Sequence, residues 1–115
     1  MEAILAIFTQ RILEQLDELE RELERTRADW RKRKGVFHDE GYVYLENLGV
    51  IDEELRCVRR TRERITGMDL TGFTEVDDLR ARMVSELEDM YDSSVLMRSG
   101  IAIIIGLVRK LPACL

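Results

Sequence analysis

One apolar repeat runs through residues 75–111 for about five heptads with hardly a break. Its positions follow one another at intervals of four and three residues in alternation: Val76, Leu79, Met83, Leu87, Met90, Ser94, Met97, Ile101, Ile104, Val108 and Leu111. A spacing that averages about 3.5 residues places these side chains along one stripe of a helix, and another helix must cover such a stripe. The repeat therefore predicts a long helix packed within a helical bundle.

The composition agrees with long amphipathic helices. Charged residues make up 36% of the 115 residues and aromatic residues 6%, a balance unlike that of a β-sandwich or barrel. The one proline, Pro112, lies near the end of the sequence, so no proline interrupts a helix before it. A chain of this length forms a single domain.

Two further helices are expected before the long one, over residues 2–34 and 39–66. The stripe of the first contains Leu5, Phe8, Ile12, Leu16, Leu19, Leu23, Thr26 and Trp30. The stripe of the second contains Tyr44, Leu48, Ile51, Leu55, Val58 and Ile65, with Arg62 on the seam. Between the second and third helices, we expect Met68, Leu70 and Phe73 of the loop 67–73 to plug the end of the bundle.

Short connections force consecutive helices to run antiparallel. The sequence thus predicts an all-α fold, an antiparallel three-helix, coiled-coil-like bundle with helices at about 2–34, 39–66 and 75–111 in one domain of residues 1–115. The third helix, at about 1.5 Å per residue, would extend for about 55 Å and outrun the second, which would reach about 42 Å. Its overhang is its most apolar part, because residues 100–108 contain no polar side chain.

An apolar overhang favours self-association, and a symmetric dimer is the simplest way to bury it. The start of the first helix is also apolar, and in a three-helix bundle it would not meet the end of the third. The predicted oligomer or partner interface consists of Ile4, Phe8, Met97, Ile101, Ile103, Ile104, Ile105, Val108 and Leu111.

The apolar segment is too short to suggest a membrane span. Arg98 and Arg109 bracket an uncharged stretch of about ten residues, whereas a span needs roughly twenty. A buried core helix is the favoured interpretation. A helix that lies on a membrane surface or binds a partner protein stays open as an alternative.

Two cysteines, Cys57 and Cys114, lie far apart and lack the spacing of metal ligands. The sequence opens without the basic region of a secretory signal, so both are expected to be reduced thiols of a cytoplasmic protein. The arginines around Cys57 would favour its thiolate. A nucleophile also needs a positioned base, however, and the one histidine lies about five helical turns away, so Cys57 is expected to be a packed thiol.

No catalytic, cofactor-binding or metal-binding motif is present. His38 is followed by Asp39 and Glu40, which permits a metal site or general base as a third hypothesis. No second histidine and no Glu-x-x-His pair exists for a di-metal bundle site, and the many glutamates are expected to lie on solvated helix faces. We therefore expect no enzyme, no cofactor and no metal.

Two basic clusters provide an alternative function. They are the first basic cluster, residues 31–34, and the second basic cluster, residues 56–64. Together they would bind nucleic acid or phosphate. The net charge of -5 argues against general affinity for nucleic acid, and the antiparallel hairpin is expected to hold the clusters about 35 Å apart. Pairing with the acidic stretch 14–24 is expected to satisfy most of these cations.

The leading functional hypothesis is a non-enzymatic helical-bundle interaction protein: an adaptor, small chaperone or assembly subunit. It would self-associate, with a dimer favoured, and bind a partner helix through an apolar groove. The alternative is the nucleic-acid or phosphate-binding protein described above.

Overall fold

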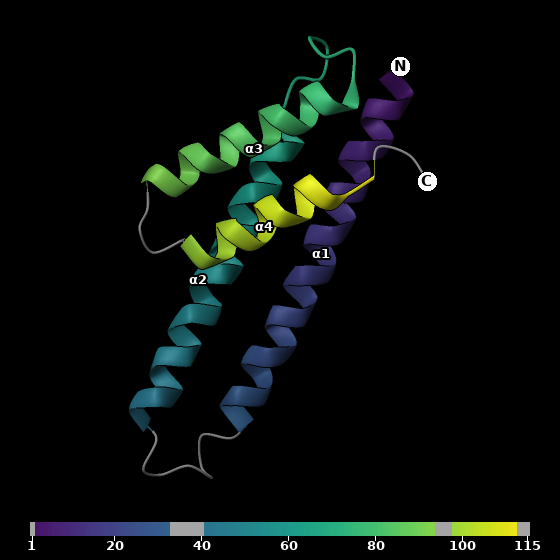
Figure 1. The fold of residues 1–115 in the computed structure, drawn as a ribbon. Helices are drawn as coiled ribbons and strands as arrows, with labels where there is room; N and C mark the ends of the chain where they lie inside the picture. Colours follow the sequence, from purple (N-terminus) through teal and green to yellow (C-terminus); the bar gives the residue numbers. More distant parts are fainter. Residues whose placement is uncertain (1, 33–40, 94–97, 113–115) are drawn as a thin grey trace.

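The structure, a computed structural model, describes residues 2–32, 41–93 and 98–112, with side chains over 3–32, 45–90 and 101–112. All regular structure in these ranges is helical, in α1 (Glu2–Lys32), α2 (Gly41–Thr66), α3 (Val76–Ser93) and α4 (Arg98–Lys110). The predicted all-α fold is confirmed. Figure 1 shows α1 and α2 as a long hairpin that α3 and α4 cross near one end, and the molecule is elongated, 56 × 28 × 21 Å.

The predicted helix 75–111 is replaced by two helices, α3 and α4. They lie side by side and pack against each other, and α4 also packs on α2 (Figure 1). A single helix would leave its apolar end in water, whereas the reversal brings the second half of the stripe onto the rest of the chain. The apolar spacing is the same on both sides of the break, so it does not distinguish one long helix from two that fold back.

One buried cluster draws on all four helices. It contains Leu5, Phe8, Ile12 and Leu16 of α1, Cys57, Val58 and Ile65 of α2, Val76, Leu79, Met83, Leu87 and Met90 of α3, and Ile101, Ile104 and Val108 of α4. These are the predicted stripe positions apart from Cys57, which lies next to one. Met68, Leu70 and Phe73 pack against the cluster from the loop before α3, as predicted.

The reversal also joins two apolar ends that a three-helix bundle would keep apart. Phe8 near the start of α1 and Ile104 and Val108 of α4 lie in the same buried cluster. Arg80 of α3 lies over the Phe8 ring, 5.3 Å from its centroid, and donates a 2.7 Å hydrogen bond to the Leu111 carbonyl just after α4. Since that carbonyl has no partner in the helix that precedes it, the guanidinium caps the C-terminal end of α4.

The hairpin has two different ends. At the four-helix end, residues 3–16 of α1 and 57–66 of α2 lie under α3 and α4. The rest of the hairpin, residues 19–32 of α1 with 45–55 of α2, is called the arm here. Its Leu19 and Leu23 pack against the edge of the buried cluster, and its far end extends beyond α3 and α4 in Figure 1. Ile51 and Leu55 are buried in the arm, but Leu19, Leu23 and Leu48 are only half-buried.

Candidate functional site

The predicted interface residues fall into three groups in the structure. Phe8, Ile101, Ile104 and Val108 are fully buried in the chain's own core, and Ile105 and Leu111 are half-buried against it. Ile4 and Ile103 are exposed. Met97 lies outside the described residues, as do His38 and Cys114. In this conformation the core thus uses much of the surface that the sequence assigns to a partner.

Other large apolar side chains are exposed as well: Ile7, in the apolar start of the first helix that the sequence predicts to be uncovered, and Leu45 and Val50, which the sequence analysis did not name. Ile7 is 50% exposed, Leu45 66% and Val50 47%, against 49% for Ile4 and 48% for Ile103. These residues lie next to stripe positions rather than on them, so a search for the repeat alone misses them. Leu45 and Val50 both belong to the arm.

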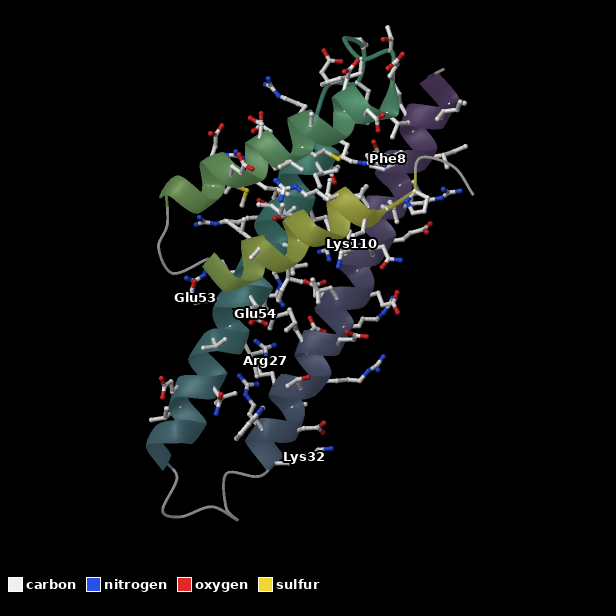
Figure 2. The ribbon with its side chains drawn as sticks, viewed as in Figure 1. Phe8, Arg27, Lys32, Glu53, Glu54 and Lys110 are labelled. Atoms are coloured by element: carbon white, nitrogen blue, oxygen red, sulfur yellow. The ribbon has the colours of Figure 1, made fainter. Side chains whose placement is uncertain are left out.

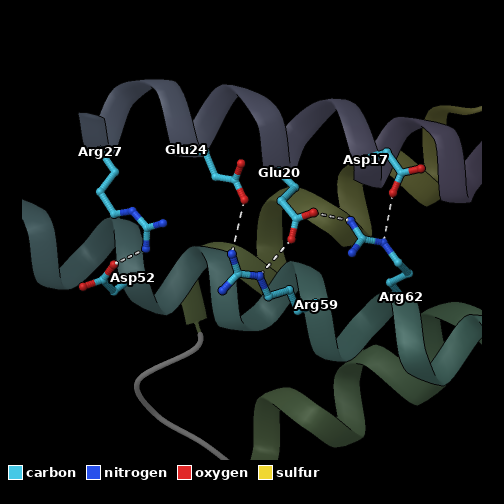
Figure 3. Close-up of polar contacts among 7 residues, drawn as sticks. All are labelled: Asp17, Glu20, Glu24, Arg27, Asp52, Arg59 and Arg62. Atoms are coloured by element: carbon cyan, nitrogen blue, oxygen red, sulfur yellow. Dashed lines mark hydrogen bonds and ion pairs between the residues drawn. The ribbon is translucent and has the colours of Figure 1, made fainter. Parts of the chain in front are cut away.

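A ladder of ion pairs joins α1 and α2 along the hairpin (Figure 3). Arg59 Nε lies 2.8 Å from Glu20 Oε2, and its Nη2 lies 3.3 Å from Glu24 Oε1. Arg62 pairs with Asp17 and with the other oxygen of Glu20, both at 3.0 Å. The ladder explains why Arg62 tolerates a seam position, and it confirms that arginines of α2 pair with the acidic stretch of α1.

The ladder changes the proton affinity of its members. Partial desolvation raises the pKa of Glu20, but the hydrogen bonds and charges of Arg62 and Arg59 outweigh it and lower the pKa below its usual value. The hydrogen bond to Glu20 raises the pKa of Arg59. Glu54 lies on α2 without such a partner in the described part of the chain, and desolvation raises its pKa.

Beside the ladder, five arginines converge on one open groove of about 530 Å³, called here the arginine groove. Its lining consists of Arg27, Arg31, Asp52, Leu55, Arg56, Arg59, Arg60 and Glu63. Three of the arginines are held by carboxylates: Arg27 by Asp52 at 3.2 Å, Arg56 by Glu53 at 2.7 Å, and Arg59 by the ladder. Arg31 and Arg60 are exposed and make no ion pair within the described residues.

The arginine groove corrects the expected separation of the two basic clusters. Arg31 belongs to the first basic cluster, and Arg56, Arg59 and Arg60 belong to the second, yet all four line one groove. The expected 35 Å was wrong because it ran from one end of α2 to the other. The ion pair of Arg27 with Asp52 shows instead that the last turn of α1 lies about one turn of α2 from Arg56.

Sequence reasoning also missed Arg27 as part of this groove. It lies four residues before Arg31, which places both side chains on the same face of α1. Extending the first basic cluster by one helical turn toward the N-terminus would have found it. Residues 33 and 34 of that cluster lie outside the described residues.

Cys57 is a packed thiol, as expected, but its environment does not favour the thiolate. Its side chain is fully buried, and burial raises the pKa of the thiol to about 11. The charges of Glu54 and Glu53 contribute to this rise in the pKa, and a hydrogen bond with Thr61 opposes it. Arg56, Arg59 and Arg60 are exposed on α2 whereas the thiol is buried, and the first two are held in ion pairs, which is why the sequence-based expectation of a favoured thiolate was wrong.

Within the described residues, no group of three or more His, Cys, Asp or Glu side chains is placed to hold a metal ion. In the same part of the chain, no helix combines the length and the apolar character required to cross a bilayer. Comparisons with protein-family models, with curated proteins and with solved structures find no match to this chain.

Proposed function

We propose that this protein is a non-enzymatic interaction protein that associates with a second copy of itself through the arm. The incomplete burial of the arm supports the proposal most directly. The stripe residues Leu19 and Leu23 are half-buried, whereas stripe residues of α1 at the four-helix end are fully buried. Leu45 and Val50, which lie next to stripe positions of α2, are exposed. Two helices cannot enclose an apolar stripe from all sides, whereas two hairpins together make a four-helix bundle.

The charges of the arm suit a copy of itself as the partner. Along α1, acidic residues predominate at 18–24 and basic residues at 25–32, toward the tip of the arm. In a two-fold pairing of antiparallel arms, the basic tip of one protomer meets the acidic stretch of its partner. The arm is therefore self-complementary in charge as well as in its apolar stripe.

The same stripe would also accept an amphipathic helix of another protein, which is the adaptor form of the proposal. In that form the protein remains non-enzymatic and the partner is a different chain. The cytoplasmic location inferred from the cysteines stays a prediction.

Light scattering and sedimentation over about 1–100 μM test self-association. The wild-type protein is expected to be a dimer at the upper end of this range. The double variant Leu45→Lys/Val50→Lys is expected to be a monomer, because charges five positions apart, about 140° around α2, keep both sides of the arm in water. The matched control is Ile4→Lys/Ile7→Lys, which adds the same charge to exposed apolar positions outside the arm and should leave the dimer intact.

A monomeric wild-type protein at 100 μM would contradict self-association. Only the adaptor form of the proposal would then remain. A dimer that survives the arm substitutions and is lost in the Ile4 and Ile7 control would move the contact to the start of α1. Circular dichroism on each variant confirms that its helices are retained.

A further inference from the structure

We propose that the arginine groove is a binding site for the phosphate groups of a polyanion. The inference rests on the groove alone and does not require self-association. Two elements distant in sequence build the site: Arg27 and Arg31 come from the last turns of α1, and Arg56, Arg59 and Arg60 come from the middle of α2. Five guanidinium groups thus border one open groove.

The paired arginines keep donors available for a ligand. A guanidinium has five N–H donors in a planar fork. Arg27 and Arg56 each place one Nη1 atom against a carboxylate, and Arg59 uses its Nε and Nη2. The carboxylates hold these side chains in position, so a ligand meets guanidiniums that already have restricted freedom. Such preorganised forks match the tetrahedral oxygens of phosphate.

Arg31 and Arg60 supply the charge that no protein carboxylate neutralises. Both are exposed, and neither makes an ion pair within the described residues. Because the groove is open and its charges are spread over two helices, it suits several linked phosphates better than a single small anion. The phosphates of a nucleic acid strand and those of a free oligophosphate share this chemistry.

The acidic character of the rest of the molecule limits the strength of this binding. The chain carries a net charge of -5, and Asp52 and Glu63 are part of the groove lining. Attraction is therefore confined to the groove and should be strongly weakened by salt. We expect binding near 50 mM salt and little at 200 mM.

The test measures binding of three probes to the wild-type protein by fluorescence anisotropy or calorimetry at 50 mM salt. The probes are a labelled single-stranded oligonucleotide of mixed sequence, inorganic tripolyphosphate, and a polyglutamate peptide of similar charge. Binding of the oligonucleotide supports the proposal. If tripolyphosphate binds as well, the groove accepts a free oligophosphate; if it does not, the groove requires a nucleic acid strand. Failure of both phosphate probes, or equal binding of polyglutamate, overturns the proposal.

The groove is located with the double variant Arg31→Gln/Arg60→Gln, which removes two charges without breaking an ion pair of the described residues. Its affinity for the oligonucleotide is expected to fall about tenfold, and the slope of log K against log salt by about 1.5, as for two lost phosphate contacts on a single strand. The control Arg21→Gln/Arg25→Gln removes the same charge from exposed positions of α1 that do not line the groove. Equal losses in both variants overturn the assignment to the groove.

Light scattering on the same samples separates this inference from the proposed function. If phosphate binding is absent and the dimer is intact, only the inference about the arginine groove fails. A monomer that still binds the oligonucleotide contradicts the self-association and leaves the groove in place.

Discussion

The four-helix end and the arm carry the same kind of apolar stripe on the same two helices. At the four-helix end, Leu16 of α1 and Val58 of α2 are fully buried because α3 and α4 cover them. In the arm, Leu23 and Leu48 occupy equivalent stripe positions and are half-buried. Stripe positions of α1 are thus buried more completely where α3 and α4 reach them, although Ile51 and Leu55 of α2 are buried in the arm as well. A stripe in the sequence shows only that its side chains favour burial.

The polar contacts differ between the two regions as well. The ladder and the arginine groove join α1 and α2 from Arg62 at the four-helix end to Arg27 and Asp52 in the arm (Figure 3). Their ion pairs are exposed or half-exposed and contribute roughly 0–1 kcal/mol each. The four-helix end depends on apolar burial, with Arg80 as a polar contact between α1, α3 and the end of α4. Figure 2 labels Phe8 on α1 and Lys110 on α4 at this end, and Arg27 and Lys32 along the arm. We therefore expect the stability of the molecule to be concentrated at the four-helix end.

The largest expected effect is the contrast between Ile104→Ala and Leu23→Ala. Ile104 is fully buried at the four-helix end, so its truncation should lower the free energy of unfolding by about 2–5 kcal/mol. Leu23 is half-buried in the arm, and its truncation should cost about 1 kcal/mol in the monomer. Urea unfolding at low protein concentration measures both.

Protein concentration sharpens this contrast. If the arm is a dimer contact, the cost of Leu23→Ala should rise at high protein concentration while that of Ile104→Ala stays the same. Equal costs for the two substitutions at low concentration would contradict the difference between the two ends.

A smaller effect is expected for Arg80→Gln. The substitution removes the contact with the Phe8 ring and the cap on the Leu111 carbonyl, and should cost about 1–2 kcal/mol. Arg82→Gln is the matched control on the same helix, because Arg82 is well exposed and pairs within α3 with Glu86 at 3.2 Å. Hydrogen exchange should accelerate at the end of α4 in the Arg80 variant and not in the control.

The smallest effect distinguishes two glutamates by the pH dependence of stability. Since the ladder lowers the pKa of Glu20, its stabilisation is present above the usual value of 4.5 and is lost as pH falls through the lowered value. Since desolvation raises the pKa of Glu54, its carboxyl favours the folded state below 4.5, and that contribution is lost as pH rises through the raised value.

The variants Glu20→Gln and Glu54→Gln should therefore change the slope of stability against pH in opposite directions, each by less than about 1 kcal/mol. Urea midpoints between pH 3 and 7 provide the measurement. If the slope of stability against pH changes in the same direction in both variants, the environments assigned to Glu20 and Glu54 are wrong.

The sequence predicts much of the fold because burial follows the apolar stripes closely. The stripe positions from Leu5 to Leu16, from Val76 to Met90 and from Ile101 to Val108 are buried, as are Val58 and Ile65, and the loop residue Phe73 packs where expected. The reversal between α3 and α4 was not predicted, because an apolar period carries no information about direction. Ser93, Ser94, Ser99 and Gly100 are weak helix formers near the break, but the sequence analysis placed them within one helix, with Ser94 on its stripe.

The candidate site was predictable in part. The pairing of Arg59 and Arg62 with α1 follows from opposite charges on antiparallel helices, and the structure confirms it. The convergence of Arg31 and Arg60 on one groove depends on the register of α1 against α2. That register depends on how the apolar stripes pack, and an error in the predicted helix bounds changes the predicted register. The positions of the charged residues in the sequence are therefore not enough to predict it.

The contact of Phe8 with Arg80, and of Arg80 with Leu111, has a consequence for the order of events during synthesis. Helix α1 is synthesised before α4, which completes its cover, and roughly a hundred residues separate Phe8 from Val108. At about 5–20 residues per second, the stripe around Phe8 would remain uncovered for about 5–20 seconds before α4 is synthesised. During that interval the exposed apolar stripe of one nascent chain can associate with that of another. A chaperone that binds the start of α1 would therefore raise the yield of folded protein.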